Sequence, residues 1–222
     1  MPEVDFTFII PTKNEEQYIG DCLESIRKQK GRYEIIVVDS HSQDNTVRIA
    51  RKYAKVLFEK RRGPGVARNT GAKKARGNIL VFIDSDVVVP GDFLKRLKGN
   101  FKEPIVGCIF KQKTDTSLVW FWNLLVKYAT RAGFIITNGC CFAFDAATFR
   151  KAGGFDSNLL TNEDHDMARR ISLYGRFFFM DDIGIFVSSR RMRRGMLKFL
   201  KLNLKATLTY FLNRKSLPEY WG

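Results

Sequence analysis

The first half of the chain alternates between short apolar runs and segments whose apolar residues recur at helical spacing. The apolar runs are rich in β-branched and aromatic residues, which is typical of buried strands. They cover 6–10, 33–40, 55–60 and 78–90. The helical segments cover 14–30, 42–54 and 63–77. This β-α-β-α-β-α-β order predicts a parallel sheet with helices on both faces.

The ends of the predicted helices carry suitable capping residues. Asn14 is placed to cap the first helix, and acidic residues follow in its first turn, where the helix dipole favours them. Ser42 or Asp44 would cap the second helix. The third helix would open at Gly63 and end at Gly77.

The second half of the chain is less regular but continues the α/β pattern. Helical patterns cover 90–101, 117–129 and 162–175. Strand patterns cover 105–113 and 176–187, and 139–156 combines a strand with a helix. The helix at 117–129 is aromatic and amphipathic. No internal repeat or linker divides the sequence.

Two acids interrupt the apolar run "NILVFIDSDVVVP". Asp84 and Asp86 are separated only by Ser85, although like charges repel and a carboxylate away from water needs a partner. Residues two apart at a strand end project to the same side, so both carboxylates can approach one cation. Oxygen ligands without cysteine or histidine suit Mg²⁺ or Mn²⁺, which complete their shells with substrate phosphates. The alternative is a pair of solvated turn acids, but the preceding apolar run favours the cation site.

Polar residues also end the first two predicted strands, at Pro11-Thr12 and at Asp39. Parallel sheets bind ligands at the carboxyl ends of their strands, so these residues and the two acids should converge on one edge. Asp39 would accept hydrogen bonds from a ribose or a base, or merely cap the next helix. Arg68 and Asn69 would donate to phosphate or to the acids of the metal site.

A second acidic cluster, Glu163, Asp164 and Asp166, lies at a predicted helix start. Helix-dipole partners and a general base are both compatible with this pattern, and the residues alone leave both open. His41 and His165 are the only histidines, which argues against a catalytic triad or a histidine-rich metal site. We expect His165 to be simply a polar helix residue.

The net charge of +15 predicts an anionic partner. Residues 190–222 carry nine Lys or Arg and one acid, with apolar residues at helical spacing. Such a segment is typical of a basic amphipathic helix on an anionic membrane surface, although an ordinary surface helix would have the same pattern. Arginine side chains match phosphate oxygens, so Arg190 and Arg191 would grip a leaving diphosphate or face lipid.

The cysteines indicate a reducing compartment. None of the four has metal-ligand spacing, and two are adjacent, which favours free thiols. The sequence shows no signal peptide and no apolar run of the ~18 residues that span a bilayer. We therefore expect a cytoplasmic protein, peripheral at the cytoplasmic face of the membrane.

Five segments occur in a specific order along the chain. They are "FIIPTKNEE", "EIIVVDSHSQDNT", "GVARNTGAKKARGNILVFIDSDV", "GCCFAFDAATFRKAGGFD" and "NEDHDMARRI". With them the chain resembles the inverting glycosyltransferases of family 2 from about Phe6 to about Arg194. The resemblance implies a GT-A (Rossmann-like) three-layer α/β fold with a mainly parallel sheet. The catalytic domain would cover 1–189, with a nucleotide-binding half at 1–100 and an acceptor half at 101–189, before the C-terminal segment.

The resemblance also implies roles for individual residues. Asp86 would be the principal ligand of Mn²⁺ or Mg²⁺, and Asp84 would lie near metal and ribose. Asp164 would be the catalytic base, and Glu163 would help orient Asp164 or the acceptor. The nucleotide pocket would be lined by Pro11, Thr12, Asn14, Glu15, Asp39, Arg68, Asp84 and Ser85, with Arg190 and Arg191 at the diphosphate.

The implied reaction moves a sugar from a nucleotide-sugar donor, with GDP-mannose or UDP-glucose favoured, to a lipid-linked or other glycan acceptor. The Q-x-x-R-W motif of processive members is missing, which favours single transfers. One rival is a haloacid-dehalogenase-like phosphotransferase, but that family places D-x-D on its first strand. The other is a basic nucleic-acid-binding module, but the sequence has no helix-turn-helix or RNA-binding signature, so nucleic acid is not an expected partner.

Overall fold

The computed structural model describes residues 4–61, 63–114, 118–137 and 139–188, with Lys205 and Thr209 in addition. The predicted basic helix at 190–222 therefore lies outside the described residues, apart from Lys205 and Thr209. Arg190 and Arg191 are among the residues not described. Within the described part, no helix is both long and apolar enough to cross a membrane.

Every strand and helix that the sequence predicts before residue 189 is present, and the predicted strand at 78–90 is divided into β4 and β5 by a turn. The strands are β1 (Phe6–Thr12), β2 (Tyr33–Asp39), β3 (Lys55–Phe58), β4 (Ile79–Ile83), β5 (Val87–Val88), β6 (Ile105–Lys113), β7 (Cys141–Asp145) and β8 (Arg176–Val187). The helices are α1 (Ile19–Arg27), α2 (Thr46–Ala50), α3 (Pro64–Ala72), α4 (Phe93–Asn100), α5 (Leu118–Arg131), α6 (Ala146–Lys151) and α7 (Glu163–Ile171).

Several predicted helix ends are wrong. Helix α2 begins at Thr46 with Asn45, not Ser42 or Asp44, at the N-cap position, and α7 ends at Ile171 before Gly175. Helix α1 begins at Ile19, and Asn14 instead adopts a left-handed conformation with φ of 54°, which asparagine tolerates better than most residues. Helix α3 ends at Ala72, well before Gly77. A Cβ atom at Gly77 would lie 2.5 Å from the backbone nitrogen of Thr7. Only a glycine therefore lets the chain pass this close to β1.

The strands form one mixed sheet in the order β3-β2-β1-β4-β7-β6-β8-β5. The first four are parallel, while β7 runs antiparallel to both β4 and β6. At the far edge β6 and β8 are parallel, and the short β5 runs antiparallel to β8. Only β5 and β7 thus depart from the common direction, which confirms the predicted mainly parallel sheet.

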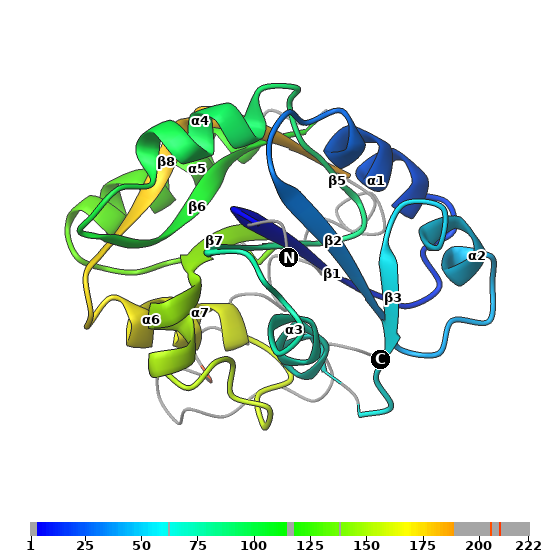
Figure 1. Ribbon diagram of the computed structural model, residues 1–222. Helices are drawn as coiled ribbons and strands as arrows, with labels where there is room; N and C mark the ends of the chain where they lie inside the picture. The colour runs from blue at the N-terminus through cyan, green and yellow to red at the C-terminus, as the bar shows by residue number, and fades with distance from the viewer. Residues whose placement is uncertain are drawn as a thin grey trace.

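Helices cover both faces of this sheet, as alternate residues of each strand show. In β1, Phe8 and Ile10 join a core cluster with α1 and α4, whereas Ile9 joins a second cluster with α5, α6 and α7. Figure 1 shows α3, α6 and α7 on the side of the strands opposite α1. The molecule therefore has the predicted three layers.

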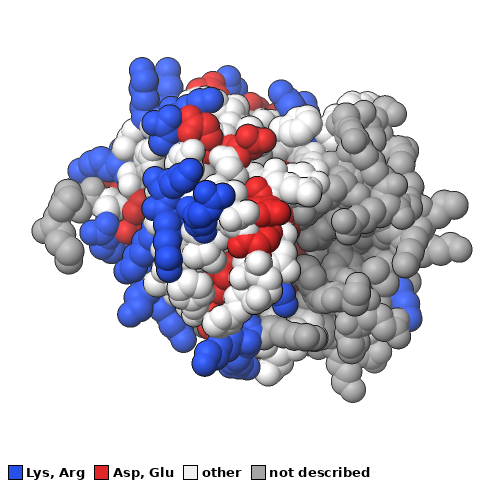
Figure 2. Space-filling model, turned by 90° about the vertical axis from the view of Figure 1, so that its right-hand side faces the viewer, with Lys and Arg blue, Asp and Glu red and all other residues white. Residues whose placement is uncertain are grey.

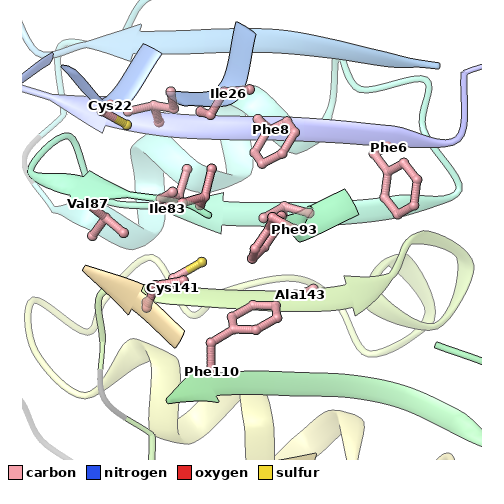
Figure 3. Packing of buried hydrophobic residues seen from close by; sticks show 14 of the residues in the cluster. Phe6, Phe8, Cys22, Ile26, Ile83, Val87, Phe93, Phe110, Cys141 and Ala143 are labelled. Atoms are coloured by element: carbon pink, nitrogen blue, oxygen red, sulfur yellow. The ribbon is translucent and has the colours of Figure 1, made fainter. Parts of the chain in front are cut away.

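The first cluster is centred on aromatic side chains between the sheet and α4. Phe93 packs against Phe110, with ring centroids 4.9 Å apart, and against Phe8 at 6.1 Å (Figure 3). All four cysteines are free and buried, and Cys22 and Cys141 belong to this cluster. The prediction of free thiols is thus confirmed for all four.

Helix α3 lies unusually close to the strands beneath it. A Cβ atom at Gly71 would lie 2.5 Å from Cγ2 of Ile9 and 3.2 Å from Cγ2 of Val38. The glycine therefore lets the helix approach β1 and β2 directly. This approach fixes the helix that carries Arg68.

On the face that carries α2 and β3, Lys and Arg side chains are numerous and acidic side chains are fewer (Figure 2).

Candidate active site

The sequence predicted that polar residues at the ends of the first strands lie along one edge of the sheet. The structure has this edge, because β2, β1 and β4 are adjacent and parallel. Thr12 and Asp39 are register partners at the ends of β1 and β2, and Asp84 directly follows β4. Asp39 is buried and accepts hydrogen bonds from the Ser42 backbone (2.8 Å), the Ser42 hydroxyl (2.5 Å) and the Thr12 hydroxyl (3.2 Å). These bonds hold the edge in shape, and the contact of Asp39 with a ribose or base stays a prediction.

The loops that follow β1 and β2 are fastened to each other. The Asn14 backbone donates to the Ser42 hydroxyl at 2.8 Å, and the Asn14 side chain accepts from the Gln43 backbone at 2.8 Å. The Glu15 backbone donates to the Thr46 hydroxyl at 2.7 Å. Four predicted pocket residues, Pro11, Thr12, Asn14 and Glu15, thus belong to one rigid edge.

The D-x-D segment is a turn between β4 and β5. The Val87 backbone donates to the Asp84 carbonyl at 3.2 Å, and the Asp84 backbone donates to the Cys140 carbonyl at 2.8 Å. Asp84 and Asp86 are both partly exposed, whereas Ser85 between them is buried. This alternation is the one expected of two acids on the same side of the chain, and it leaves both of them partly accessible to solvent.

Arg68 is the residue that joins the two acidic clusters. Its side chain is 3 % exposed, contacts Glu163 through a charged hydrogen bond and donates to Asp84 at 3.0 Å. It also donates to the Gly139 carbonyl at 3.2 Å, and its guanidinium lies 5.0 Å from the ring centroid of Phe142. The arginine predicted to bind the nucleotide therefore also organises the acids. Its neighbour Asn69 pairs with the Phe155 backbone and not with these acids.

The pKa values of Glu163 and Asp164, the first two acids of α7, are shifted in opposite directions. Burial raises the pKa of Glu163 to about 7, against the pull of Arg68. Burial also acts to raise the pKa of Asp164, but His165, Thr137 and Arg68 outweigh it and hold that pKa well below its usual range. At neutral pH the carboxylate of Asp164 is therefore ionised, and Glu163 is close to its midpoint.

Thr137 and His165 are site residues that sequence reasoning missed. The Thr137 hydroxyl donates to one oxygen of Asp164, and Nδ1 of His165 lies 3.2 Å from the other. His165 is therefore not the simple polar helix residue that was expected. Thr137 lies just before the "GCCFAF" strand, but no spacing in the sequence links it to an acid 27 positions away.

The D-x-D turn fits a divalent cation of the oxygen-binding kind. Its two carboxylates are hard oxygen donors at an open edge, as Mg²⁺ and Mn²⁺ require. Among the described residues, no group of three His, Cys, Asp or Glu side chains is arranged to hold a metal ion. A cation at this turn would therefore take most of its ligands from water and a bound phosphate.

A family model described as "Glycosyl transferase family 2" matches residues 7–156. Among curated proteins, the chain is 39 % identical over 100 residues to the poly(ribitol-phosphate) beta-N-acetylglucosaminyltransferase TarS of Staphylococcus aureus, covering 40 % of this chain and 18 % of TarS. It is 39 % identical over 98 residues to the glycosyltransferase AglE of Haloferax volcanii, covering 40 % of this chain and 32 % of AglE. The chain thus spans a third or less of these relatives.

Solved structures share the fold over most of the chain. The mannosyltransferase PcManGT of Pyrobaculum calidifontis, in complex with GDP-Man and Mn²⁺, has a TM-score of 0.72 and 25 % identity, covering 84 % of this chain and 57 % of its own. S. aureus TarS 1-349 in complex with UDP-GlcNAc has a TM-score of 0.69 and 25 % identity, covering 83 % and 58 %. Both are GT-A glycosyltransferases, which confirms the predicted fold.

Proposed function

Because this chain belongs to glycosyltransferase family 2, we propose that it moves a sugar from a nucleotide-sugar donor to an acceptor hydroxyl, inverting the anomeric configuration. The observation that carries the proposal is the contact of one buried arginine, Arg68, with both Asp84 and Glu163. This arrangement joins a cation-binding turn to a helix that presents an ionised carboxylate. The membership leaves no support for the haloacid-dehalogenase-like alternative.

The donor would lie across the edge formed by β2, β1 and β4. Pro11, Thr12, Asn14, Glu15 and Asp39 would receive the nucleoside, because parallel sheets bind ligands outside the carboxyl ends of their strands. Asp86, with Asp84, would hold Mn²⁺ or Mg²⁺, which supplies positive charge beside the diphosphate when bound. Ser85 and Arg68 complete this side of the site, and Arg190 and Arg191 would face the leaving diphosphate.

Asp164 would act as the catalytic base. The acceptor oxygen forms a bond to the anomeric carbon while the bond from that carbon to the diphosphate oxygen breaks, and its electron pair leaves with the diphosphate. The acceptor hydroxyl becomes strongly acidic as its new bond forms, so an already ionised carboxylate can take the proton. Glu163, fixed by Arg68, would orient the acceptor or Asp164.

The donor and acceptor are proposed from chemistry and from the relatives. GDP-mannose and UDP-glucose remain favoured, and the neighbouring complexes with GDP-Man and UDP-GlcNAc add UDP-N-acetylglucosamine to the set. The acceptor would be lipid-linked or another glycan, met at the cytoplasmic face of the membrane. The basic segment at 190–222 supports the membrane location, since clustered Lys and Arg attract anionic lipid.

A thermal-shift screen with these three nucleotide sugars, with and without Mn²⁺, tests the proposal. One donor should raise the melting temperature, because a ligand that binds only the folded state stabilises it. Asp86→Ala should remove the Mn²⁺-dependent part of that shift, whereas Asp92→Ala, in an exposed ion pair with Arg96 on α4, should retain it. If no nucleotide sugar changes the melting temperature or yields a transferred sugar, the proposed function is wrong.

A further inference from the structure

Helix α5 has two apolar faces, and within the described part of the chain only one of them packs on the sheet. Val119, Asn123, Val126 and Thr130 recur at helical spacing and are buried. Asn123 fastens this inner face to β6, because its side chain accepts from the Gln112 backbone at 2.9 Å and donates to the Gln112 carbonyl at 2.7 Å. These two hydrogen bonds fix which face of α5 lies against the sheet.

The opposite side of α5 exposes large apolar residues to solvent. Trp120 is 68 % exposed and Phe121 is 64 % exposed, and Phe134, just past the helix, is 72 % exposed. We call the exposed set the aromatic face of α5; it comprises Trp120, Phe121, Trp122, Leu125, Tyr128 and Phe134. A contiguous apolar surface of this kind marks a contact with a partner or a membrane.

The composition and charge of this surface favour a membrane. Trp and Tyr are the side chains enriched where hydrocarbon meets water. Basic residues adjoin the aromatic face: Lys127 forms an ion pair with Asp181, and its hydrogen bond, with the charges of Lys111 and Arg131, lowers the pKa of that aspartate. Three cations thus act on Asp181, while the neighbouring Asp182 accepts a hydrogen bond from Asn100 on α4. The basic residues on this side of α5 therefore outnumber the acids.

Net charge also distinguishes a membrane from a second copy of the chain. Each chain carries +15, so two copies repel each other, whereas an anionic bilayer attracts the chain. We propose that the aromatic face of α5 docks into the interface of an anionic phospholipid membrane. The aromatic face adds apolar insertion to the electrostatic attraction that the sequence predicts for the basic segment at 190–222.

The aromatic face of α5 is close to the candidate active site along the chain. Phe134 is three residues before Thr137, whose hydroxyl donates to Asp164, so their Cα atoms are at most about 11 Å apart. A bilayer that receives Phe134 would therefore bring the hydroxyl of a lipid-borne acceptor close to Asp164. This placement of the acceptor rests on the proposed function, but the membrane contact does not.

Vesicle flotation of the full chain tests the inference. Vesicles of equimolar phosphatidylcholine and phosphatidylglycerol should bind the wild type more tightly than vesicles of phosphatidylcholine alone. The double variant Trp120→Ser, Phe121→Ser should lower binding to the anionic vesicles about tenfold or more, since it removes two interfacial aromatics. The segment at 190–222 is identical in both proteins, so the difference reports on α5.

The matched control is Leu173→Ser with Tyr174→Ser, an adjacent exposed pair just after α7 whose Leu173 is 82 % exposed. It should bind vesicles like the wild type, and both double variants should keep the wild-type melting temperature. Equal binding by wild type and the α5 variant would overturn the inference. So would a concentration-dependent dimer that the α5 variant abolishes, combined with no vesicle binding. Vesicle binding without sugar transfer would support docking and refute only the proposed function.

Discussion

Arg68 in the middle of α3 and Glu163 at the first position of α7 form a buried ion pair across 95 positions of the chain. The same guanidinium donates to Asp84. Two acidic clusters that are remote in sequence therefore share one buried cation.

Replacing Arg68 tests how much this shared cation stabilises the fold. Arg68→Met should lower the free energy of unfolding by about 3 kcal/mol or more, because it leaves Glu163 and Asp84 without their cation. The matched control is Arg76→Met, which breaks an exposed ion pair with Glu34 and should cost about 1 kcal/mol or less. Urea unfolding measures both, and equal losses would argue against the bridging role of Arg68.

Asp164→Asn separates chemistry from donor binding. The amide keeps the shape of the side chain but cannot take the acceptor proton, so the transfer rate should fall about 100-fold or more. The donor-induced shift in melting temperature should remain. The control is Asp166→Asn, two residues further along the same helix, where the side chain accepts from Arg170 at 2.7 Å. This variant should keep most of the transfer rate. Loss of donor binding together with transfer in Asp164→Asn would assign Asp164 a structural role.

Thr137→Val tests the hydroxyl that contacts Asp164. Removing it should cost about 1–2 kcal/mol of stability. It should also raise the pKa of Asp164, because a hydrogen bond to the charged form favours that form. The acid limb of the pH–rate profile should therefore move to higher pH. Thr130→Val is a suitable control, since its buried hydroxyl has no hydrogen-bond partner within the described part of the chain; it should leave the profile unchanged.

The pKa of Glu163 predicts a pH dependence of stability. Burial raises it from 4.5 to about 7, so between these values the folded state binds a proton that the unfolded state has lost. Stability from this group should therefore fall as pH rises from about 4.5 to 7, by up to about 1.4 kcal/mol per pH unit. Above pH 7 the contribution levels off.

Glu163→Gln, a neutral counterpart of the protonated acid, isolates that contribution. The unfolding free energy of this variant, measured by urea titration across the same pH range, should change less steeply than that of the wild type. His165 contributes in the same direction at higher pH, because Asp164 raises its pKa although burial opposes this. Parallel pH curves for the two proteins would show that Glu163 is not the titrating group.

Two glycines in helices should respond oppositely to alanine. Gly71→Ala places a Cβ atom against Ile9 and Val38 under α3 and should cost about 1–3 kcal/mol. Gly99→Ala, in α4, meets no atom within 4 Å and should stabilise by about 0.5–1 kcal/mol, since alanine favours a helix. Thermal unfolding of the two variants gives the comparison, and a stabilised Gly71→Ala protein would contradict the close approach of α3.

Local periodicity determined much of this protein. The spacing of apolar residues predicted the helices and strands up to residue 187, except that β4 and β5 were expected as one strand. The parallel order of β2, β1 and β4 placed Thr12, Asp39 and Asp84 at one edge. Helix ends were less well predicted: Asn14 was taken as a cap, but its bonds to the loop after β2 draw it out of α1. Long-range contacts override local propensity at such positions.

Only the tertiary structure decided which side chains meet. Spacing shows which face of an element is buried but not its partner, so the contacts of Arg68 with Glu163 and of Thr137 with Asp164 had no sequence signal. The same is true of α5, where both faces are apolar and either could have packed on the sheet. The fold buries Val126 and exposes Phe121, because Asn123 on the Val126 side satisfies the polar groups of Gln112 on β6.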